Sequence, residues 1–349
     1  MKAALNALFV SNSLAFILSL VYVFFPAQNL YWNGFGLFLI IILTANILVS
    51  LKDNHHTKLE IGYLTLSSLG LFLVMGLNTL TSLYPRNALS RSIVAIVLVL
   101  SMTIVGAFLS KAALADKKKL HFHHSNISFK SKRPSRFNPR RLLLGFLAFL
   151  LVLGTLMAFF MLVPISISIA EVILSQYSLF YSLIFLSIAA LFLKLSHLKR
   201  GSWGWYGMLT LGGMLYLAFN VPLVFLPSML SQAEENYTEA FGEDWQTLDD
   251  DQIFFRESPV SLPDYFLGIQ SEPYHLEEGV LYYEGMEGVD EDLELRFDVY
   301  TPPTDASELP GQGAVLIRIH GGGWNTGGRG AQNFAQFNKY FASQGYVVF

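Results

Sequence analysis

Long uninterrupted runs of apolar residues dominate the first two thirds of the chain. Asp, Glu, Lys and Arg are absent from Ala3 to Leu51, a stretch that Pro26 and the polar pair Gln28 and Asn29 divide into two parts. A bilayer core of about 30 Å needs about 20 residues of apolar helix, because no water there satisfies exposed backbone groups. The pattern predicts seven membrane-spanning helices, roughly 5–25, 32–51, 60–83, 91–111, 142–163, 176–195 and 204–227.

Polar residues are rare within these predicted spans. Glu60 and Glu171 lie at span edges, and we interpret 164–175 as a short interfacial connection. Asn46, Asn78 and Asn220 could line a transport path, but hydrogen bonding between helices is their commoner role. We therefore interpret residues 1–228 mainly as a membrane anchor of about seven helices.

Charge divides the chain into two halves of opposite sign. Residues 1–228 carry 18 Lys and Arg against 4 Asp and Glu, whereas residues 229–349 carry 5 against 22. Nine of the cations lie in 117–141, a loop that resists translocation and is therefore expected on the cytoplasmic side. Seven crossings then place the N-terminus inside and the acidic region outside a plasma or cytoplasmic membrane, with 229–275 as an acidic linker or stalk.

The pattern of apolar positions changes to alternation after about residue 276. Leu293, Leu295, Phe297 and Val299 alternate with charged residues, which is typical of a strand with one buried face. A second predicted strand, 314–319, runs into His-Gly-Gly-Gly-Trp at 320–324; a helix over about 331–344, a C-cap at Gly345 and a strand over 346–349 follow. This strand–helix–strand order predicts a largely parallel sheet.

These residues resemble the start of an α/β-hydrolase domain. The match comprises 320–324 directly after a strand, Leu295-x-Phe-Asp-Val-Tyr-x-Pro302 upstream and Gly345-Tyr-Val-Val-Phe349 downstream. It covers only about 276–349 and is most similar to HGGGW-bearing carboxylesterases of the hormone-sensitive-lipase and feruloyl-esterase types. The resemblance predicts a membrane-anchored serine hydrolase whose substrate is a small carboxylic ester.

The chemistry of ester hydrolysis fits the glycine run. Attack on an ester carbonyl develops negative charge on oxygen, which fixed backbone N–H donors stabilise, and glycine lets the backbone come close. By resemblance, Gly322 and Gly323 supply oxyanion-hole donors, Gly321 shapes the turn, His320 orients the loop and Trp324 packs beneath it or beside the substrate. A plain glycine turn between strand and helix is the structural alternative, and no phosphate-binding loop motif is present.

The remaining catalytic groups of that family are not found in these 349 residues. A G-x-S-x-G nucleophile elbow is absent, and no His follows His320 to act as the base. We therefore expect this stretch to be an N-terminal fragment that is itself inactive.

Composition excludes several other classes of protein. Only 14% of residues are charged, against about 25% in soluble domains, and there is no Cys for a disulfide, a thiolate metal site or a Cys nucleophile. His121, His123 and His124 fit a solvated basic loop better than a metal site, so no metal or cofactor is expected. The expected partners are the lipid bilayer and an ester substrate, without nucleic acid.

Two alternatives to a simple anchored esterase remain open. The helices could instead form a transporter or scaffold that carries a non-catalytic hydrolase-like module. The helices of an active enzyme could also present membrane lipids to it as substrates.

Overall fold

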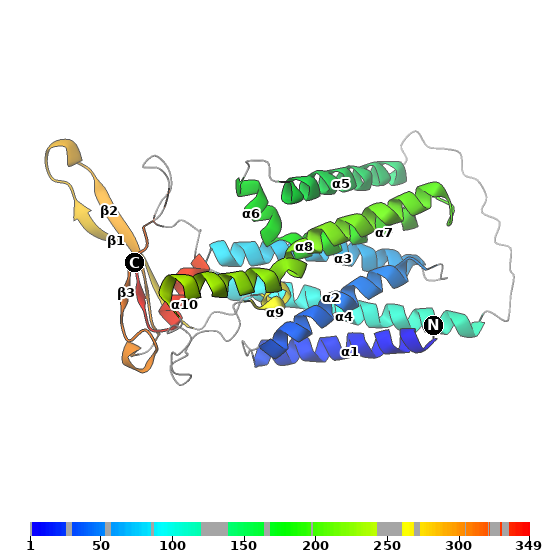
Figure 1. Cartoon of the computed structure of the whole chain (residues 1–349), viewed down its shortest axis with the longest axis horizontal. Coiled ribbons are helices and arrows are strands. Elements are labelled where there is room, and N and C mark those ends of the chain that lie inside the picture. Colours follow the sequence, from blue (N-terminus) through cyan, green and yellow to red (C-terminus); the bar gives the residue numbers. More distant parts are fainter. Residues whose placement is uncertain are drawn as a thin grey trace. The chain divides into compact units, whose positions relative to one another are not determined.

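The computed structural model describes residues 2–25, 30–52, 57–84, 87–119, 139–163, 168–196, 198–242, 260–268, 273–303, 305–319, 321, 329 and 335–349. The chain forms two compact units (Figure 1). The helical unit comprises Met1–Gly76, Ala95–Gly242 and Val260–Leu267, and the sheet unit comprises Leu77–Val94, Glu243–Pro259 and Gly268–Phe349. The end of one long helix and the start of the next therefore belong to the sheet unit.

Seven helices of the described chain are long and apolar enough to cross a bilayer, as the sequence predicts. Each predicted span corresponds to one of them, with ends that differ by a few residues at most places. They are α1 (Lys2–Phe24), α2 (Leu30–Ser50), α3 (Thr57–Leu83), α4 (Ala88–Lys119), α5 (Pro139–Leu162), α7 (Ser178–Leu195) and α8 (Trp203–Phe241). The chain is thus compatible with a multi-pass membrane protein.

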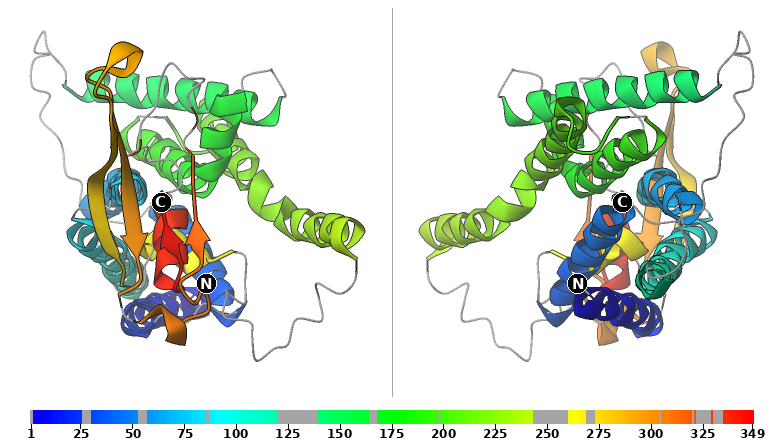
Figure 2. Two further views of the ribbon diagram at one scale, coloured as in Figure 1. Left: turned by 90° about the vertical axis from the view of Figure 1, so that its left-hand side faces the viewer. Right: turned by 90° about the vertical axis from the view of Figure 1, so that its right-hand side faces the viewer.

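Two regions between or beyond the predicted spans are more helical than the sequence indicates. The interfacial segment contains α6 (Ser168–Gln176), a nine-residue helix. Helix α8 continues through Pro222 and Pro227 into the acidic region that we interpret as a linker. Its buried residues all lie between Gly212 and Asn220, and its second half diverges from the other helices of this unit (Figure 2).

The best-buried helix is α7, which packs mainly against α8 and also contacts α2 and α5. Small residues allow this close approach, because a Cβ on Gly212 would lie 2.6 Å from the Ala189 Cβ. Hydroxyl pairs add directional contacts between helices: Ser67 and Ser187 lie 2.8 Å apart, and Thr44 lies 3.1 Å from the Tyr216 hydroxyl.

A short segment after α8 returns to the helical unit and packs there as α9 (Leu262–Leu267). Phe266 is fully buried, and the Tyr265 ring stacks on Phe180 with centroids 4.4 Å apart. The buried Asp264 carboxylate accepts a 2.5 Å hydrogen bond from the Tyr22 hydroxyl. The Asn33 side chain binds the backbone at the start of α9. Its Nδ2 donates to Val260 O and its Oδ1 accepts from Leu262 N, each at 2.8 Å.

The described residues of the sheet unit form four strands in the order β1-β2-β4-β3. They are β1 (His275–Glu284), β2 (Glu294–Thr301), β3 (Val315–Leu316) and β4 (Val347–Val348), with α10 (Ala335–Ser343) between β3 and β4. Strands β1 and β2 form a long antiparallel hairpin (Figure 2). Backbone hydrogen bonds extend the β3–β4 pairing, from Val347 N to Ala314 O at 2.9 Å and from Arg318 N to Phe349 O at 2.8 Å.

The sheet is mixed, so the prediction of a mostly parallel sheet is wrong for the described strands. Only β3 and β4 pair in parallel, whereas β2 is antiparallel to both β1 and β4. The nine residues between β1 and β2 are too few for a crossover helix, which parallel neighbours need. Helix α10 supplies such a crossover for β3 and β4 alone.

Gly345 ends α10 in the way that the sequence predicts. Its φ is +93°, and its N–H donates to Ala342 O at 3.0 Å. The Tyr346 N–H donates to Phe341 O at 3.0 Å and their rings pack 5.3 Å apart, which completes a Schellman motif. This turn leads β4 back into the core formed by Tyr300, Ala342 and Val348.

Candidate active site

The candidate site is the glycine run that follows β3. Gly321 is exposed in the structure, and a Cβ added to it would meet no atom within 4 Å. The other four residues that the sequence singles out, His320, Gly322, Gly323 and Trp324, lie outside the described residues. The geometry of the site is therefore given by the elements on either side.

On its N-terminal side the run begins where the parallel pairing of β3 stops. Phe349 N donates to Leu316 O at 2.8 Å, and the last backbone bond joins Arg318 to β4, two residues before His320. Loops that follow parallel strands gather at the carboxyl edge of a sheet, where α/β proteins bind ligands. The arrangement β3, glycine run, α10 and β4 is the one that the sequence predicts.

Arg318 and Asn338 fix the start of this run against the helix that follows it. The Arg318 Nε donates to the Asn338 side-chain oxygen at 3.1 Å, and Asn338 is almost fully buried on α10. Asn338 also hydrogen-bonds Tyr300, although burial dominates and raises the pKa of that phenol. Burial likewise raises the pKa of Tyr274 to about 12, so neither phenol is ionised near neutral pH.

At its far end the same loop is tied to β2 through Arg329. The Arg329 Nε lies 3.0 Å from Asp298 Oδ1, which also accepts a 2.7 Å hydrogen bond from the Gly279 N–H. Gly279 has a φ of +74° and lies in a bulge of β1. The sequence pattern does not predict this pair, because Asp298 occupies one of the regular charged positions of its alternating strand and Arg329 lies 31 residues further along the chain.

Lys339 joins α10 to the end of α3, within the sheet unit. It is 1% exposed, and its Nζ donates to Thr81 O at 3.0 Å. Burial, with a smaller contribution from the Arg91 charge, lowers the pKa of Lys339 to about 8. Arg91 donates to Leu80 O, so two cations bind carbonyls at the C-terminal end of one helix.

Several buried polar side chains in the described part of the helical unit hydrogen-bond to one another or to the backbone. Asn12 and Asn46 exchange two amide hydrogen bonds of 3.0 and 2.8 Å between α1 and α2, as the sequence predicts for Asn46. Asn220 instead donates to Tyr216 O in its own helix, at 2.7 Å. Glu60 pairs with Lys194 at 2.7 Å, so this buried charge is compensated.

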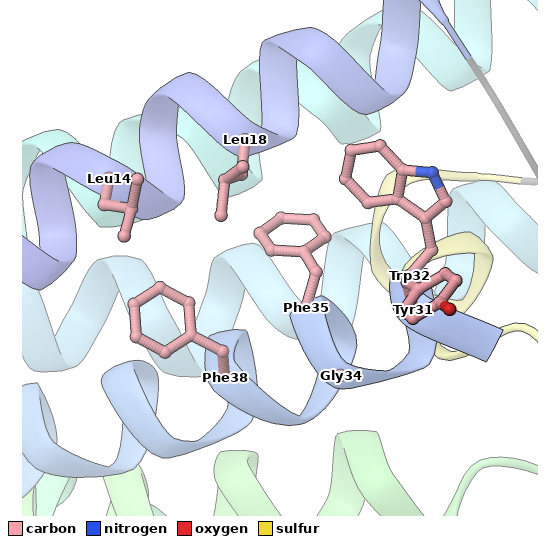
Figure 3. A pocket seen from close by; sticks show the side chains of 7 residues that line it. All are labelled: Leu14, Leu18, Tyr31, Trp32, Gly34, Phe35 and Phe38. Carbon is pink, nitrogen blue, oxygen red and sulfur yellow. The ribbon is translucent and has the colours of Figure 1, made fainter. Parts of the chain in front are cut away.

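A pocket of about 410 Å³ lies between α1 and α2 (Figure 3). Leu14 and Leu18 project from α1 toward the aromatic side chains of α2, among them Trp32 and Phe35 (Figure 3). Its lining is almost wholly apolar and suits a hydrocarbon chain rather than a polar solute. Among the described residues, no cluster of three His, Cys, Asp or Glu could hold a metal ion; His121, His123 and His124 lie outside them.

Comparison with protein-family models, with curated proteins and with solved structures yields no match.

Proposed function

We propose that residues 276–349 form the start of an α/β-hydrolase-type domain, and that the protein to which they belong is a membrane-anchored serine hydrolase of carboxylic esters. One observation carries the proposal: β3 is followed after three residues by His-Gly-Gly-Gly-Trp, and then by α10 and the parallel strand β4. In lipases and esterases with such a motif, the loop after the third strand supplies an oxyanion donor. Here too the motif follows the third of the described strands.

In this proposal the backbone N–H groups of Gly322 and Gly323 bind the developing oxyanion. Gly321 shapes the turn, His320 orients the loop and Trp324 packs beneath it or beside the ester. Arg318 with Asn338 at one end and Arg329 with Asp298 at the other hold the loop's ends on the sheet unit. Donors fixed before the reaction cost no reorganisation as charge develops, which is the source of their catalytic effect.

The proposal requires a nucleophile, an acid and a base from outside residues 1–349, since no G-x-S-x-G occurs within them. An exposed apolar stripe over β3 and the three residues after it is consistent with further covering structure. Val315, Ile317 and Ile319 are 56%, 76% and 88% exposed, although they alternate as the buried face of a strand does. An apolar edge strand of this kind is normally paired or covered.

The helices act as an anchor in this account, and the hydrolase-like region lies outside the cytoplasm. Lys339 ties α10 to the end of α3, and Tyr22 ties α9 to the end of α1. The charge distribution of the sequence assigns both of these helix ends to the outer side. The transporter or scaffold alternative is less well supported, because these buried polar side chains pair with each other. Asn12 hydrogen-bonds Asn46, and Glu60 forms an ion pair with Lys194.

Kinetics of the product of the complete reading frame that contains residues 1–349 test the proposal. We expect hydrolysis of a p-nitrophenyl ester. We expect Gly322→Ala or Gly323→Ala to lower kcat with KM little changed, because an added Cβ would move the backbone N–H away from the oxyanion; complete loss of one donor would cost roughly 10²–10³-fold. Gly62→Ala is the matched control, since a Cβ there meets no atom within 4 Å. Absence of a nucleophile elbow and a later His in that frame, or full activity of both loop variants, would contradict the proposal.

A further inference from the structure

A second cavity, of about 370 Å³, lies in the helical unit where α7 ends and α8 begins (Figure 1 shows the two helices). Unlike the pocket in Figure 3, its lining is mostly polar. The lining residues include Thr57, Lys194, Ser196, Leu198, Arg200 and Trp205. They come from two distant parts of the chain, the start of α3 and the α7–α8 junction, so the cavity exists only in the folded unit.

The charges around this cavity sum to a positive value. Lys194 is neutralised by Glu60 at 2.7 Å, and its Nζ also donates to Lys52 O at 2.6 Å. Arg200 adds a second cation, with its guanidinium carbon 5.7 Å from the Trp205 ring centroid. Arg140, whose Nε donates to Leu195 O at 2.7 Å, adds a third beside the cavity wall. The cavity lining therefore contains two cations, Lys194 and Arg200, with Arg140 close by, against the single carboxylate of Glu60.

The surrounding residues place this cavity at the level of lipid headgroups. Trp203 and Tyr206 are 94% and 53% exposed on the first turn of α8, where such rings mark a membrane interface. The lining residues Thr57, Ser196 and Arg200 belong to the stretches 52–59 and 196–203, which the positive-inside rule assigns to the cytoplasm. Anionic phospholipids bind basic pockets between helices on that side of a membrane.

We propose that this cavity binds the phosphate group of an anionic phospholipid, with Arg200 as its principal cation. Arg is suited to the role because its planar guanidinium donates two parallel hydrogen bonds to phosphate oxygens. The Trp205 ring holds the guanidinium, and the Thr57 hydroxyl lines the same space. Free phosphate offers the same oxygens; the lipid is favoured because Leu51, Leu193 and Leu198 also line the cavity and would contact the glycerol end of the acyl chains.

Lipid-dependent thermal unfolding of the chain in detergent tests this proposal. Phosphatidylglycerol, phosphatidylcholine and inorganic phosphate are titrated separately into the wild type, Arg200→Gln and Lys199→Gln. The Lys199 variant is the matched control, since it removes the same charge from the neighbouring exposed residue, which is not among those lining the cavity. Comparison of lipid-induced shifts within each variant removes any difference in their basal stability.

We expect phosphatidylglycerol alone to raise the unfolding midpoint of the wild type and of Lys199→Gln. Arg200→Gln should weaken the apparent affinity for that lipid roughly tenfold or more, because a charge-assisted hydrogen-bonding pair is lost. An equal lipid-induced shift in Arg200→Gln would overturn the proposal. So would a shift by inorganic phosphate that equals the lipid's and depends on Arg200, since it would identify the ligand as free phosphate.

Discussion

Asp298 and Arg329 form an ion pair of 3.0 Å that joins strand β2 to the loop after the glycine run. The same Asp298 oxygen accepts the Gly279 N–H at 2.7 Å, so one carboxylate holds both a strand bulge and the loop. Arg329 is 46% exposed, and exposed pairs contribute less than about 1 kcal/mol to stability. We therefore expect this pair to position the loop after the glycine run rather than to stabilise the folded protein.

Arg329→Gln should separate those two effects. We expect the unfolding midpoint to change little, while kcat of the complete enzyme falls and KM stays nearly constant, because the loop's end is less firmly held. Arg329→Lys keeps the charge and should recover part of kcat. Unchanged kcat in Arg329→Gln would show that the pair does not position the loop.

The Asn12 and Asn46 pair predicts energetic coupling between α1 and α2. Each single Ala substitution leaves the other Asn amide without this hydrogen-bond partner. The double variant should therefore lose less stability than the two single variants combined. The coupling is expected at roughly 0.5–2 kcal/mol, as for other hydrogen bonds between membrane helices. Thermal unfolding of the four proteins in detergent measures it, and strict additivity would contradict the prediction.

Gly106 provides an independent test of the same contact. A Cβ at this position would collide with the side-chain amides of Asn12 and Asn46. Gly106→Ala should therefore destabilise the wild type clearly but destabilise the Asn12→Ala/Asn46→Ala background much less. An equal loss of stability in both backgrounds would show that the added Cβ does not act through the Asn12 and Asn46 side chains.

The buried ion pair between Glu60 and Lys194 predicts an asymmetric response to substitution. Lys194→Met leaves the Glu60 carboxylate, which is fully buried, without its cation and should cost about 3 kcal/mol. Glu60→Gln/Lys194→Met removes both charges and should recover most of that loss. Unfolding midpoints measure both proteins; a double variant as unstable as the single one would argue against charge burial as the cause.

The Tyr22 hydroxyl is expected to hold α9 on the helical unit. Tyr22→Phe removes the donor to buried Asp264 and should increase hydrogen exchange of 260–267. Tyr31→Phe is the control, since Tyr31 is 87% exposed. Equal exchange in the wild type and Tyr22→Phe would assign α9's retention to its apolar contacts alone.

Lys339 predicts a rise in stability with pH. Its pKa is about 8 in the folded protein and 10.5 ordinarily, so between these values the unfolded chain binds more protons and the free energy of unfolding increases with pH. Below pH 8 Lys339 is protonated in both the folded and the unfolded state, so it adds no pH dependence to the free energy of unfolding there. We expect a higher unfolding midpoint at pH 9.5 than at pH 7 relative to Lys339→Met, and parallel pH profiles of the two proteins would contradict this.

The seven long helices could be predicted from sequence because their signal is local. A span needs only about 20 consecutive apolar residues, and that property requires no knowledge of neighbours. The ends were harder to predict: the last span was expected to end near residue 227, yet α8 continues through Pro222 and Pro227 to Phe241. The sequence also gave no sign that 260–267 returns to the helical unit, since the partners of Asp264 and Leu262 lie more than 200 residues away.

The sheet illustrates the same division between local and long-range information. The Gly345 cap and the strand–helix–strand order follow from neighbouring residues and were predictable. Strand order and direction depend on pairings between distant segments, which is why the sheet was expected to be mostly parallel. At the candidate site, the glycine motif is a contiguous signal, whereas the ion pair of Asp298 with Arg329 is formed only on folding.

Labelling by a fluorophosphonate probe tests the central claim most directly, because the probe reacts covalently with an activated serine nucleophile. The protein expressed from its complete reading frame is incubated in membranes with the probe, beside a variant in which the Ser of its nucleophile elbow is replaced by Ala. We predict labelling of the wild type and none of the variant, together with ester hydrolysis that the probe abolishes. Failure of the folded wild-type protein to label and to hydrolyse esters would contradict a serine hydrolase.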